Sequence, residues 1–184
     1  MLRPSSGCFL VMLCGLPGSG KSTAARWLGP RLDAIVVESD AVRRALIEHP
    51  VHGNAENAYV FAVIHRVVDS LLCRGHRVIL DATNLVERHR RIVRAIALQR
   101  NAPMFVLRLT ASNAIIRDRL RLRRSGEAQW DVYQRMRMSS EPISGAHTSL
   151  DTSGDTREAL ERFALLVERT VPQVAVAGER GGSP

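Results

Sequence analysis

Nine consecutive residues near the start of the chain combine glycines, a lysine and hydroxyl side chains in a spacing suited to phosphate. The segment Gly15-Leu16-Pro17-Gly18-Ser19-Gly20-Lys21-Ser22-Thr23 follows an apolar run and precedes an amphipathic stretch. It matches the P-loop, whose glycines let backbone N–H groups surround phosphate oxygens while a helix N-terminus points at them. In that motif, Lys21 contacts the β- and γ-phosphates of ATP, and the Ser22 hydroxyl ligates Mg²⁺. The sequence therefore predicts an ATP and Mg²⁺ site formed by Gly15, Pro17, Gly18, Ser19, Gly20, Lys21, Ser22 and Thr23.

Lys21 is the only lysine among 184 residues, and the other 25 of the 26 basic side chains are arginines. Codon usage in a G+C-rich genome explains arginine wherever only a surface charge is needed. A lysine kept against this background indicates a position where a compact ammonium does what a planar guanidinium cannot. The composition therefore strengthens the prediction that Lys21 binds phosphate.

Candidates for handling a phosphoryl acceptor lie at 38–43, directly after the second apolar run. Because the carboxyl ends of neighbouring strands in a doubly wound sheet open into one crevice, we expect Asp40 to face the phosphates. Its carboxylate could accept the proton of an attacking hydroxyl, and Arg43 could hold an anionic or hydroxyl-rich acceptor. The alternative is that Asp40 only caps a helix beginning at Ala41.

The third apolar run, at 78–80, is followed by Asp81-Ala82-Thr83-Asn84 and is similar to a Walker B motif. An acid in this position holds Mg²⁺ through water or orients a neighbouring arginine. Asn84 could donate or accept a hydrogen bond with the nucleotide or the acceptor. The alternative for Asn84 is a purely local role, since Asn and Asp favour the turns at which strands end.

Basic residues gather from Arg88 to Arg124, where eleven arginines stand beside one acid, Asp118. Such a field suits nucleotide phosphates or a nucleic-acid backbone. Arg119 and Arg123 share one face of a predicted helix, so a mobile lid could bring both guanidinium groups over the transferring phosphoryl. An exposed basic helix face is the alternative for the other arginines. The aromatic content of 4% gives little support for base stacking.

Short apolar runs alternate with longer amphipathic stretches, which is the pattern of βα units wound on a parallel sheet. Strands are predicted at 8–14, 34–38, 77–81, 103–109 and 147–152, and the first four are continuously apolar, as buried parallel strands are. Helices are predicted at 21–28, 41–48, 56–74, 86–100, 112–124, 127–138 and 156–170, with Ser112 and Asp155 as caps and an exposed loop at 49–57. The fold class is therefore α/β, a P-loop NTPase fold with a five-stranded parallel sheet, helices on both faces and a helical lid.

We expect one kinase-like domain over residues 1–171, with the lid at about 112–138, and a mobile tail at 172–184. Apolar residues make up 45% and no run approaches the length of a membrane span. The three cysteines and six histidines lack zinc-ligand spacing, so no zinc site is predicted. The apolar run before the P-loop continues directly into the motif, which argues against a cleaved signal and favours a cytoplasmic protein.

Together, the P-loop, the segment at 38–43, the run at 78–84 and the arginine-bearing helix resemble the small P-loop kinases related to the phage-type polynucleotide kinase domain. They are also similar to zeta-toxin and chloramphenicol phosphotransferase relatives. The resemblance runs from about residue 9 to residue 170. It implies that Lys21 and Ser22 bind ATP and Mg²⁺, that Asp40 is the general base and that Arg43 contacts the acceptor. It further implies that Asp81 supports the metal or orients an arginine, and that Arg119 and Arg123 are the lid arginines. The loop around Thr152 to Gly154 would border the adenine.

These residues predict in-line transfer of the γ-phosphoryl group of ATP to a hydroxyl. The preferred function is a kinase for a small acceptor such as a sugar, a nucleoside or an antibiotic. The alternatives are a polynucleotide 5′-hydroxyl kinase that uses the field from Arg88 to Arg124, and a non-kinase ATP-binding switch with a protein partner. Asp40 and Arg43 favour a kinase over the switch, because neither is needed simply to hold ATP.

Overall fold

The structure is a computed structural model that describes residues 7–51, 53–122 and 126–171, without the side chains of 126–129. The predicted tail at 172–184 and the predicted lid residue Arg123 lie outside these ranges. The described strands are β1 (Leu10–Cys14), β2 (Ile35–Glu38), β3 (Val78–Asp81), β4 (Met104–Thr110) and β5 (Thr148–Asp151). The described helices are α1 (Lys21–Arg31), α2 (Ser39–Leu46), α3 (Asn54–Cys73), α4 (Glu87–Gln99), α5 (Asn113–Arg121), α6 (Gly126–Met138) and α7 (Arg157–Thr170).

All five strands form one parallel sheet in the order β2-β3-β1-β4-β5. The α/β class and the five-stranded parallel sheet predicted from the sequence are thus confirmed. The register pairs Asp81 at the end of β3 with Leu13 of β1 on one side and with Glu38 of β2 on the other. Because the strands are parallel, the segments that follow β1, β2 and β3 leave the sheet at the same edge.

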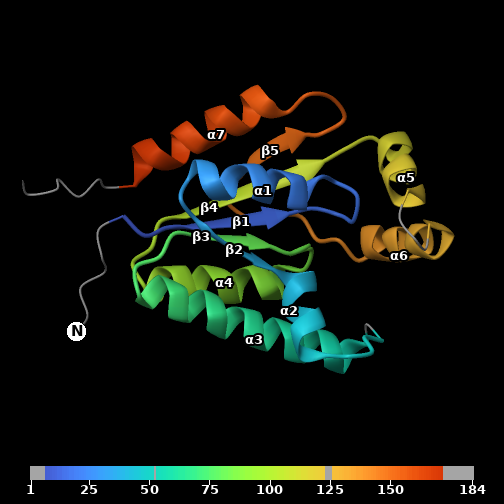
Figure 1. Ribbon diagram of the computed structural model, residues 1–184, viewed down its shortest axis with the longest axis horizontal. Coiled ribbons are helices and arrows are strands. Elements are labelled where there is room, and N and C mark those ends of the chain that lie inside the picture. The colour runs from blue at the N-terminus through green and yellow to red at the C-terminus, as the bar shows by residue number, and fades with distance from the viewer. Residues whose placement is uncertain (1–6, 52, 123–125, 172–184) are drawn as a thin grey trace, which may run out of the picture.

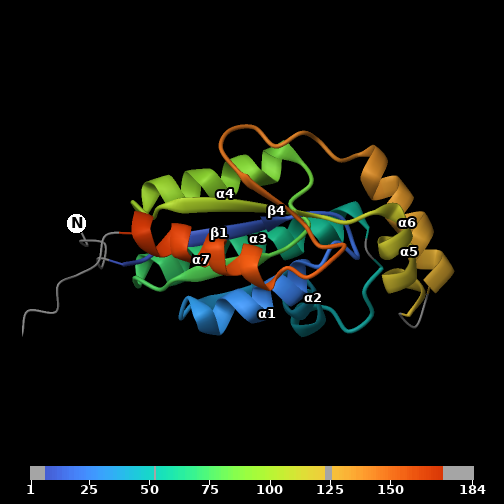
Figure 2. The same ribbon diagram turned by 90° about the horizontal axis from the view of Figure 1, so that it is seen from above.

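The helices form two layers around the sheet and a separate pair at its carboxyl edge (Figure 1). Helices α1 and α7 cover one face, where Leu13, Leu28 and Phe163 belong to one buried cluster. Helices α3 and α4 cover the other face, where Met12 and Ile64 belong to a second cluster. Helices α5 and α6 lie beyond the ends of β1 and β4, as both views show (Figures 1 and 2). This arrangement places the predicted lid over the edge where the predicted site residues leave the sheet.

The lid helices have a small core of their own. Ile116 and Leu120 from α5 pack with Tyr133 from α6, and the Tyr133 ring stacks on Trp130 with centroids 4.9 Å apart. The guanidinium of Arg117 lies over the Trp130 ring, 5.2 Å from its centroid. These aromatic rings are therefore packed within the helix pair.

The prediction that the first four strands are buried is wrong for β2. Its order in the sheet makes it an edge strand, and Ile35 and Val36 are 41% and 38% exposed. An edge strand has a neighbour on one side only, so apolar residues there remain partly accessible. Its apolar sequence resembles that of a central strand, which is why the pattern did not separate the two cases.

Several element boundaries also differ from the predicted ones. Helix α2 begins at Ser39 with Glu38 as its N-cap, so Asp40 lies inside the first turn and the alternative that it caps a helix starting at Ala41 is wrong. Ser112 is confirmed as a cap, because its hydroxyl accepts a hydrogen bond from the Ile115 N–H. At α7 the N-cap is Thr156, while the Asp155 carboxylate accepts from the Arg157 N–H at 2.9 Å. Helix α3 begins at 54, which shortens the loop predicted at 49–57.

Across the described residues, none of the helices combines the length and apolar character that crossing a membrane requires.

Candidate active site

The loop between β1 and α1 has the backbone geometry that the motif predicts. Gly15 has a φ of 155°, and a Cβ atom there would lie 2.5 Å from the Leu109 carbonyl oxygen, so only glycine fits. Gly20 is the N-cap of α1 and has a left-handed backbone with a φ of 87°. The Ser19 N–H donates to the Leu16 carbonyl at 3.1 Å, which closes the loop. The glycines therefore allow a tight turn that begins against β4 and ends at a helix N-terminus.

Polar groups inside this loop fit a bound phosphate. Ser19 is 1% exposed, and its Oγ has no hydrogen-bond partner among the described residues. In the described chain, no side chain caps the N-terminus of α1 and no acid lies in its first turn. Unsatisfied N–H groups at a helix N-terminus attract anions. The buried Lys21 adds an ammonium, whose Nζ lies 2.9 Å from the Leu16 carbonyl oxygen. The donor set thus fits the phosphates of a nucleotide.

Asp81 is the buried carboxylate of the site. It is 3% exposed at the end of β3, and burial raises its pKa above the ordinary value. A hydrogen bond from the Ser22 side chain and the charge of Lys21 lower the pKa, while the charge of Asp40 raises it further. These interactions show that Ser22, Lys21, Asp40 and Asp81, predicted separately from three segments, lie in one neighbourhood.

The hydroxyl and carboxylate of Ser22 and Asp81 are oxygen donors of the kind that Mg²⁺ prefers. Within the described ranges, no three His, Cys, Asp or Glu side chains are arranged to hold a metal ion by themselves. A Mg²⁺ ion at Ser22 and Asp81 would therefore take its remaining ligands from phosphate oxygens and water. That ligand set is usual for Mg²⁺ in nucleotide sites.

Asn84 is held at the same edge by its side chain as well as by its turn. It has a positive φ of 48°, is 2% exposed, and donates from Nδ2 to the Leu13 carbonyl oxygen at 2.7 Å. Its Oδ1 is buried without a hydrogen-bond partner among the described residues. A residue with only a turn role would not need this buried amide, so the geometry leaves an acceptor atom available for a ligand.

Of the two predicted lid arginines, the structure describes Arg119, which contacts the P-loop directly. Its Nη1 donates to the Gly18 carbonyl oxygen at 3.1 Å and to Thr152 Oγ1 at 2.8 Å. The Thr152 hydroxyl in turn donates to the Ser19 carbonyl oxygen at 3.1 Å. The sequence did not signal this link, because nothing local connects a residue after β5 with the loop after β1.

Arg43 lies in the interface between α2 and α3. It is 7% exposed, forms an ion pair with Glu56, and donates from Nη2 to Asn57 Oδ1 at 2.7 Å. The Glu56 carboxylate also accepts from the Val51 N–H at 2.7 Å, so the same group holds the loop before α3. Arg43 therefore links α2 to α3 within the protein, and its contact with an acceptor stays a prediction.

Several arginines of the basic stretch are used inside the fold. Arg90 is 1% exposed and binds Glu87 together with the carbonyl oxygens of Asn84, Leu85, Glu141 and Pro142. Arg94 also pairs with Glu87, and Arg100 pairs with Asp69. Arg90 shares the buried face of α4 with Val93 and Ala97, and this helical phase is the sequence signal that could have distinguished it.

The thiol nearest to the P-loop is unreactive. Cys14 ends β1 and is 2% exposed. Burial raises its pKa to about 12, although the charges of Arg90, Arg94 and Lys21 act in the opposite direction. The thiol therefore stays protonated at neutral pH and is not a nucleophile.

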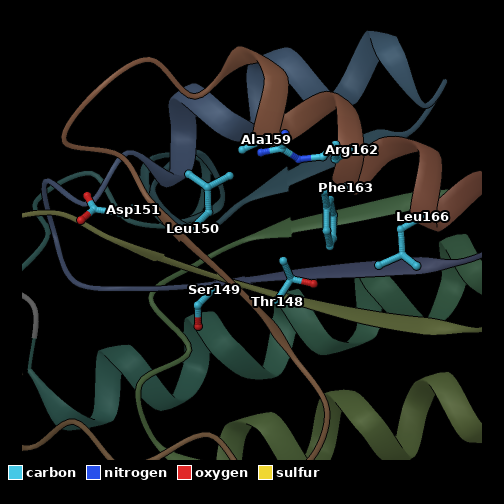
Figure 3. Close-up of a pocket in the computed structure, with 8 residues that line it drawn as sticks. All are labelled: Thr148, Ser149, Leu150, Asp151, Ala159, Arg162, Phe163 and Leu166. Atoms are coloured by element: carbon cyan, nitrogen blue, oxygen red, sulfur yellow. The ribbon is translucent and has the colours of Figure 1, made fainter.

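A cavity of about 370 Å³ lies between β5 and α7, away from the predicted catalytic residues (Figure 3). Leu150, Phe163 and Leu166 form its apolar walls, and Arg162 pairs with Glu158 along α7. None of the predicted P-loop, acceptor or lid residues lines it. We therefore place the candidate site at the carboxyl edge of the sheet.

A sequence model of the family described as "AAA domain" matches residues 10–143. Uncharacterized proteins of Mycobacterium tuberculosis and Mycobacterium bovis are 29% identical over 131 residues, which is 65% of this chain. The matching region spans only 26% of the length of these curated relatives.

Solved structures share the fold at low sequence identity. The adenylyl-sulfate (APS) kinase CysC of Mycobacterium tuberculosis, in complex with AMPPNP and APS, has a TM-score of 0.69 at 20% identity, covering 88% of this chain and 98% of that one. A gluconokinase from Sinorhizobium meliloti has a TM-score of 0.68 at 17% identity, covering 93% and 95%. Kti12 of Chaetomium thermophilum, in complex with ADP-AlF3, has a TM-score of 0.69 at 18% identity, covering 89% and 100%. The chain therefore shares its fold with these structures, two of which are named as kinases.

Proposed function

The chain belongs to the AAA domain family, and on that premise we propose that it transfers the γ-phosphoryl group of ATP to a hydroxyl of a small-molecule acceptor. One observation carries the proposal: the carboxylate of Asp40 is close enough to Asp81 to raise its pKa, and Asp81 accepts a hydrogen bond from Ser22 of the P-loop. An exposed carboxylate next to a phosphate loop is not required to hold a nucleotide. It can act as the general base where a hydroxyl must lose a proton.

In the proposed reaction, Asp40 accepts the proton of the attacking hydroxyl. The hydroxyl oxygen forms a bond to the γ-phosphorus, and the bond between that phosphorus and the bridging oxygen of ADP breaks. The P-loop N–H groups and Lys21 hold the β- and γ-phosphates, and Arg119 supplies a guanidinium at the same loop. Mg²⁺ held by Ser22, and by Asp81 through water, would offset phosphate charge. Lid helices α5 and α6 would exclude water during transfer.

The remaining predicted roles follow from this proposal. Pro17 and Thr23 belong to the nucleotide loop, and the turn from Thr152 to Gly154 would border the adenine. Asn84 would contact the acceptor or the nucleotide through its buried amide. A mobile lid at about 112–138, one domain at 1–171, and membership of the polynucleotide kinase-like, zeta-toxin-like or chloramphenicol phosphotransferase-like group are parts of the same proposal.

A small acceptor is favoured over a polynucleotide by the state of the arginines. Arg90, Arg94 and Arg100 neutralise acids of the protein itself, which reduces the field that was expected for a phosphate backbone. Two structural neighbours, an APS kinase and a gluconokinase, are named for small acceptors. A polynucleotide acceptor predicts instead a KM for the acceptor that rises steeply with salt concentration.

The test is a γ-phosphate transfer screen with the full chain, ATP and Mg²⁺. The acceptors are sugars, sugar acids, nucleosides, aminoglycosides and oligonucleotides with free 5′-hydroxyls. We expect transfer to a small acceptor, and the Asp40→Asn variant should lose about 10²–10⁴-fold in kcat while its affinity for an ATP analogue stays within about twofold.

Glu48→Gln is the matched control, because it neutralises an exposed carboxylate just beyond the same helix. Full turnover by Asp40→Asn would remove this residue from the mechanism. Binding of ATP by the wild-type chain without transfer to any acceptor would favour the switch function instead.

A further inference from the structure

We propose that Arg108 anchors a negatively charged group of the acceptor, so that the substrate is a small hydroxylated anion such as a carboxylate or a phosphate ester. This inference depends on the proposed kinase function for its biological meaning. It depends on a cavity, an unpaired cation and an unsatisfied buried atom for its physical basis.

The cavity adjoins the P-loop at the carboxyl ends of β1 and β4. It has a volume of about 530 Å³, and its lining includes Gly15, Ser19, Asn84 and Arg108. The segment that joins α6 to β5 contributes a further wall through residues 140–143 and 147. That segment is fixed by the Glu141 N–H, which donates to the Leu85 carbonyl oxygen at 3.0 Å. The volume lies within the range of about 300–1,000 Å³ that is typical of small-ligand sites.

Arg108 is an unusual residue for its position in the sheet. It lies in β4, a central strand, where the register places it beside Cys14 of β1 and Ser149 of β5. Its neighbours along the strand, Leu107 and Leu109, are buried on the other face of the sheet. Arg108 itself is exposed and makes no hydrogen bond or ion pair with any described residue. A permanently charged guanidinium in such a wall is suited to binding an anion in the cavity.

The lining as a whole carries a positive charge that the protein does not neutralise. Arg90 lies in the wall, but its guanidinium is bound to Glu87 and to backbone carbonyl oxygens. Glu141 is the acid of the lining, and its Oε2 accepts a hydrogen bond from the Glu87 N–H at 2.6 Å. In and beside the lining, Arg90, Arg94 and Arg108 stand against the two acids Glu87 and Glu141, which leaves one positive charge. Arg108 is the arginine of this set that has no carboxylate partner among the described residues.

A buried atom of the same cavity indicates a hydroxyl-bearing ligand. Asn84 Oδ1 has no partner among the described residues, and the residue is 2% exposed. An amide oxygen can only accept a hydrogen bond, so Asn84 calls for a donor such as a hydroxyl. A ligand that carries an anion for Arg108 and a hydroxyl for Asn84 would satisfy both side chains within this cavity, which adjoins the P-loop.

The experiment measures binding directly, without ATP, so that its result does not depend on catalysis. Matched acceptor pairs are titrated by calorimetry into the full chain: ribose 5-phosphate with ribose, and gluconate with glucose. We expect the anionic member of at least one pair to bind about 10–100-fold more tightly than the neutral one. The Arg108→Gln variant should lose this preference, Arg108→Lys should restore part of it, and affinity for an ATP analogue should not change.

Arg91→Gln is the matched control, because Arg91 is an exposed arginine on α4 that does not line the cavity. The inference would be overturned if the wild-type chain bound the anionic and neutral members of every pair equally. It would also be overturned if Arg108→Gln bound the anions as tightly as the wild type does. Loss of ATP-analogue affinity in Arg108→Gln would also overturn it, because the cavity would then hold the nucleotide. Arg108-dependent anion binding without phosphoryl transfer would leave the inference standing and contradict the kinase function.

Discussion

Arg119 on α5 donates a hydrogen bond to the Thr152 hydroxyl at 2.8 Å and a second one to the Thr152 carbonyl oxygen at 2.6 Å. Thr152 follows β5 and is only 6% exposed. Because its hydroxyl also donates to the Ser19 carbonyl oxygen, one side chain joins the lid to the phosphate loop. The position of the lid arginine is therefore set by a residue that touches both elements.

Replacing Thr152 by Val keeps the shape of the side chain and should weaken the link between the lid and the loop. The link is not broken, because Arg119 still donates to the Gly18 carbonyl oxygen. The change removes an acceptor for the charged Arg119 and a donor for the Ser19 carbonyl, so we expect kcat to fall about 10–100-fold. Steady-state kinetics checks this, with Thr170→Val as the control, because the Thr170 hydroxyl donates to the Leu166 carbonyl oxygen on the exposed side of α7. Unchanged kinetics in Thr152→Val would show that Arg119 is positioned without it.

Arg43 gives a test that separates a structural role from acceptor binding. Arg43 and Glu56 each have 9% exposed side chains, so Arg43→Leu leaves a buried carboxylate without its guanidinium. Removing one partner of a buried pair costs about 3–5 kcal/mol of the free energy of unfolding. Urea unfolding should show this loss, and the double variant Arg43→Leu with Glu56→Leu should recover most of it.

The acceptor KM of the double variant then decides the second role of Arg43. A KM near the wild-type value would mean that Arg43 supports the fold alone. A KM raised about tenfold or more in the restored protein would mean that the guanidinium also contacts the acceptor. A single variant as stable as the wild type would contradict the structural role.

Elements and loop chemistry could be predicted because they are local properties of the chain. The Gly15 to Thr23 motif and the apolar runs define a strand, a phosphate loop and a helix without reference to distant residues. The parallel arrangement then brings Asp81 and Asp40 to one edge, since both follow strands of the same sheet. That part of the site follows from topology alone.

Other parts depend on contacts that no local pattern encodes. Arg90 and Arg91 look alike in sequence, yet the first is buried on carbonyl oxygens and the second is exposed. Thr152 could not be linked to Arg119, because their contact depends on how the lid packs. The sequence pattern does not separate Arg108 from the other arginines of the basic stretch. Only the fold places it on a central strand, on the face that α4 covers.

Two half-buried histidines predict a pH-dependent stability. Burial lowers the pKa of His65, and the charge of His89 lowers it further, while burial and the charge of Arg88 lower the pKa of His89. The two rings lie 6.3 Å apart, and His65 Nε2 and His89 Nδ1 lack hydrogen-bond partners among the described residues. Neutral rings are therefore favoured in the folded protein.

The two imidazole rings bind protons more readily in the unfolded chain than in the folded one. The stability that the neutral rings contribute is therefore fully present above a pH of about 6.5, and it is lost as the pH falls through the lowered pKa values. Urea unfolding at about pH 7.5 and about pH 5 should show the loss, and His65→Gln should reduce it. His76→Gln changes an exposed histidine and should behave as the wild type does. A pH dependence that is the same in His65→Gln would place its origin elsewhere.

Asp81 should lower the stability of the nucleotide-free protein, even though the residue takes part in the proposed reaction. Burial raises its pKa, so the folded state favours the protonated carboxyl, and stability decreases as the pH rises from the ordinary value through the raised one. At neutral pH an ionised Asp81 is therefore unfavourable. Asp81→Asn removes that charge from a site that is 3% exposed.

We expect Asp81→Asn to raise the melting temperature of the nucleotide-free protein by about 2–4 °C, which corresponds to about 1 kcal/mol in a domain of this size. Transfer activity should fall sharply, and the stabilisation that Mg²⁺ with an ATP analogue gives the wild type should shrink. Calorimetry and kinetics measure both, with Asp118→Asn as the control, since Asp118 is an exposed carboxylate of the lid. A lower melting temperature together with full activity in Asp81→Asn would show that Asp81 supports the fold instead. A carboxylate whose role is to bind Mg²⁺ should stabilise the protein only when Mg²⁺ and the nucleotide are bound.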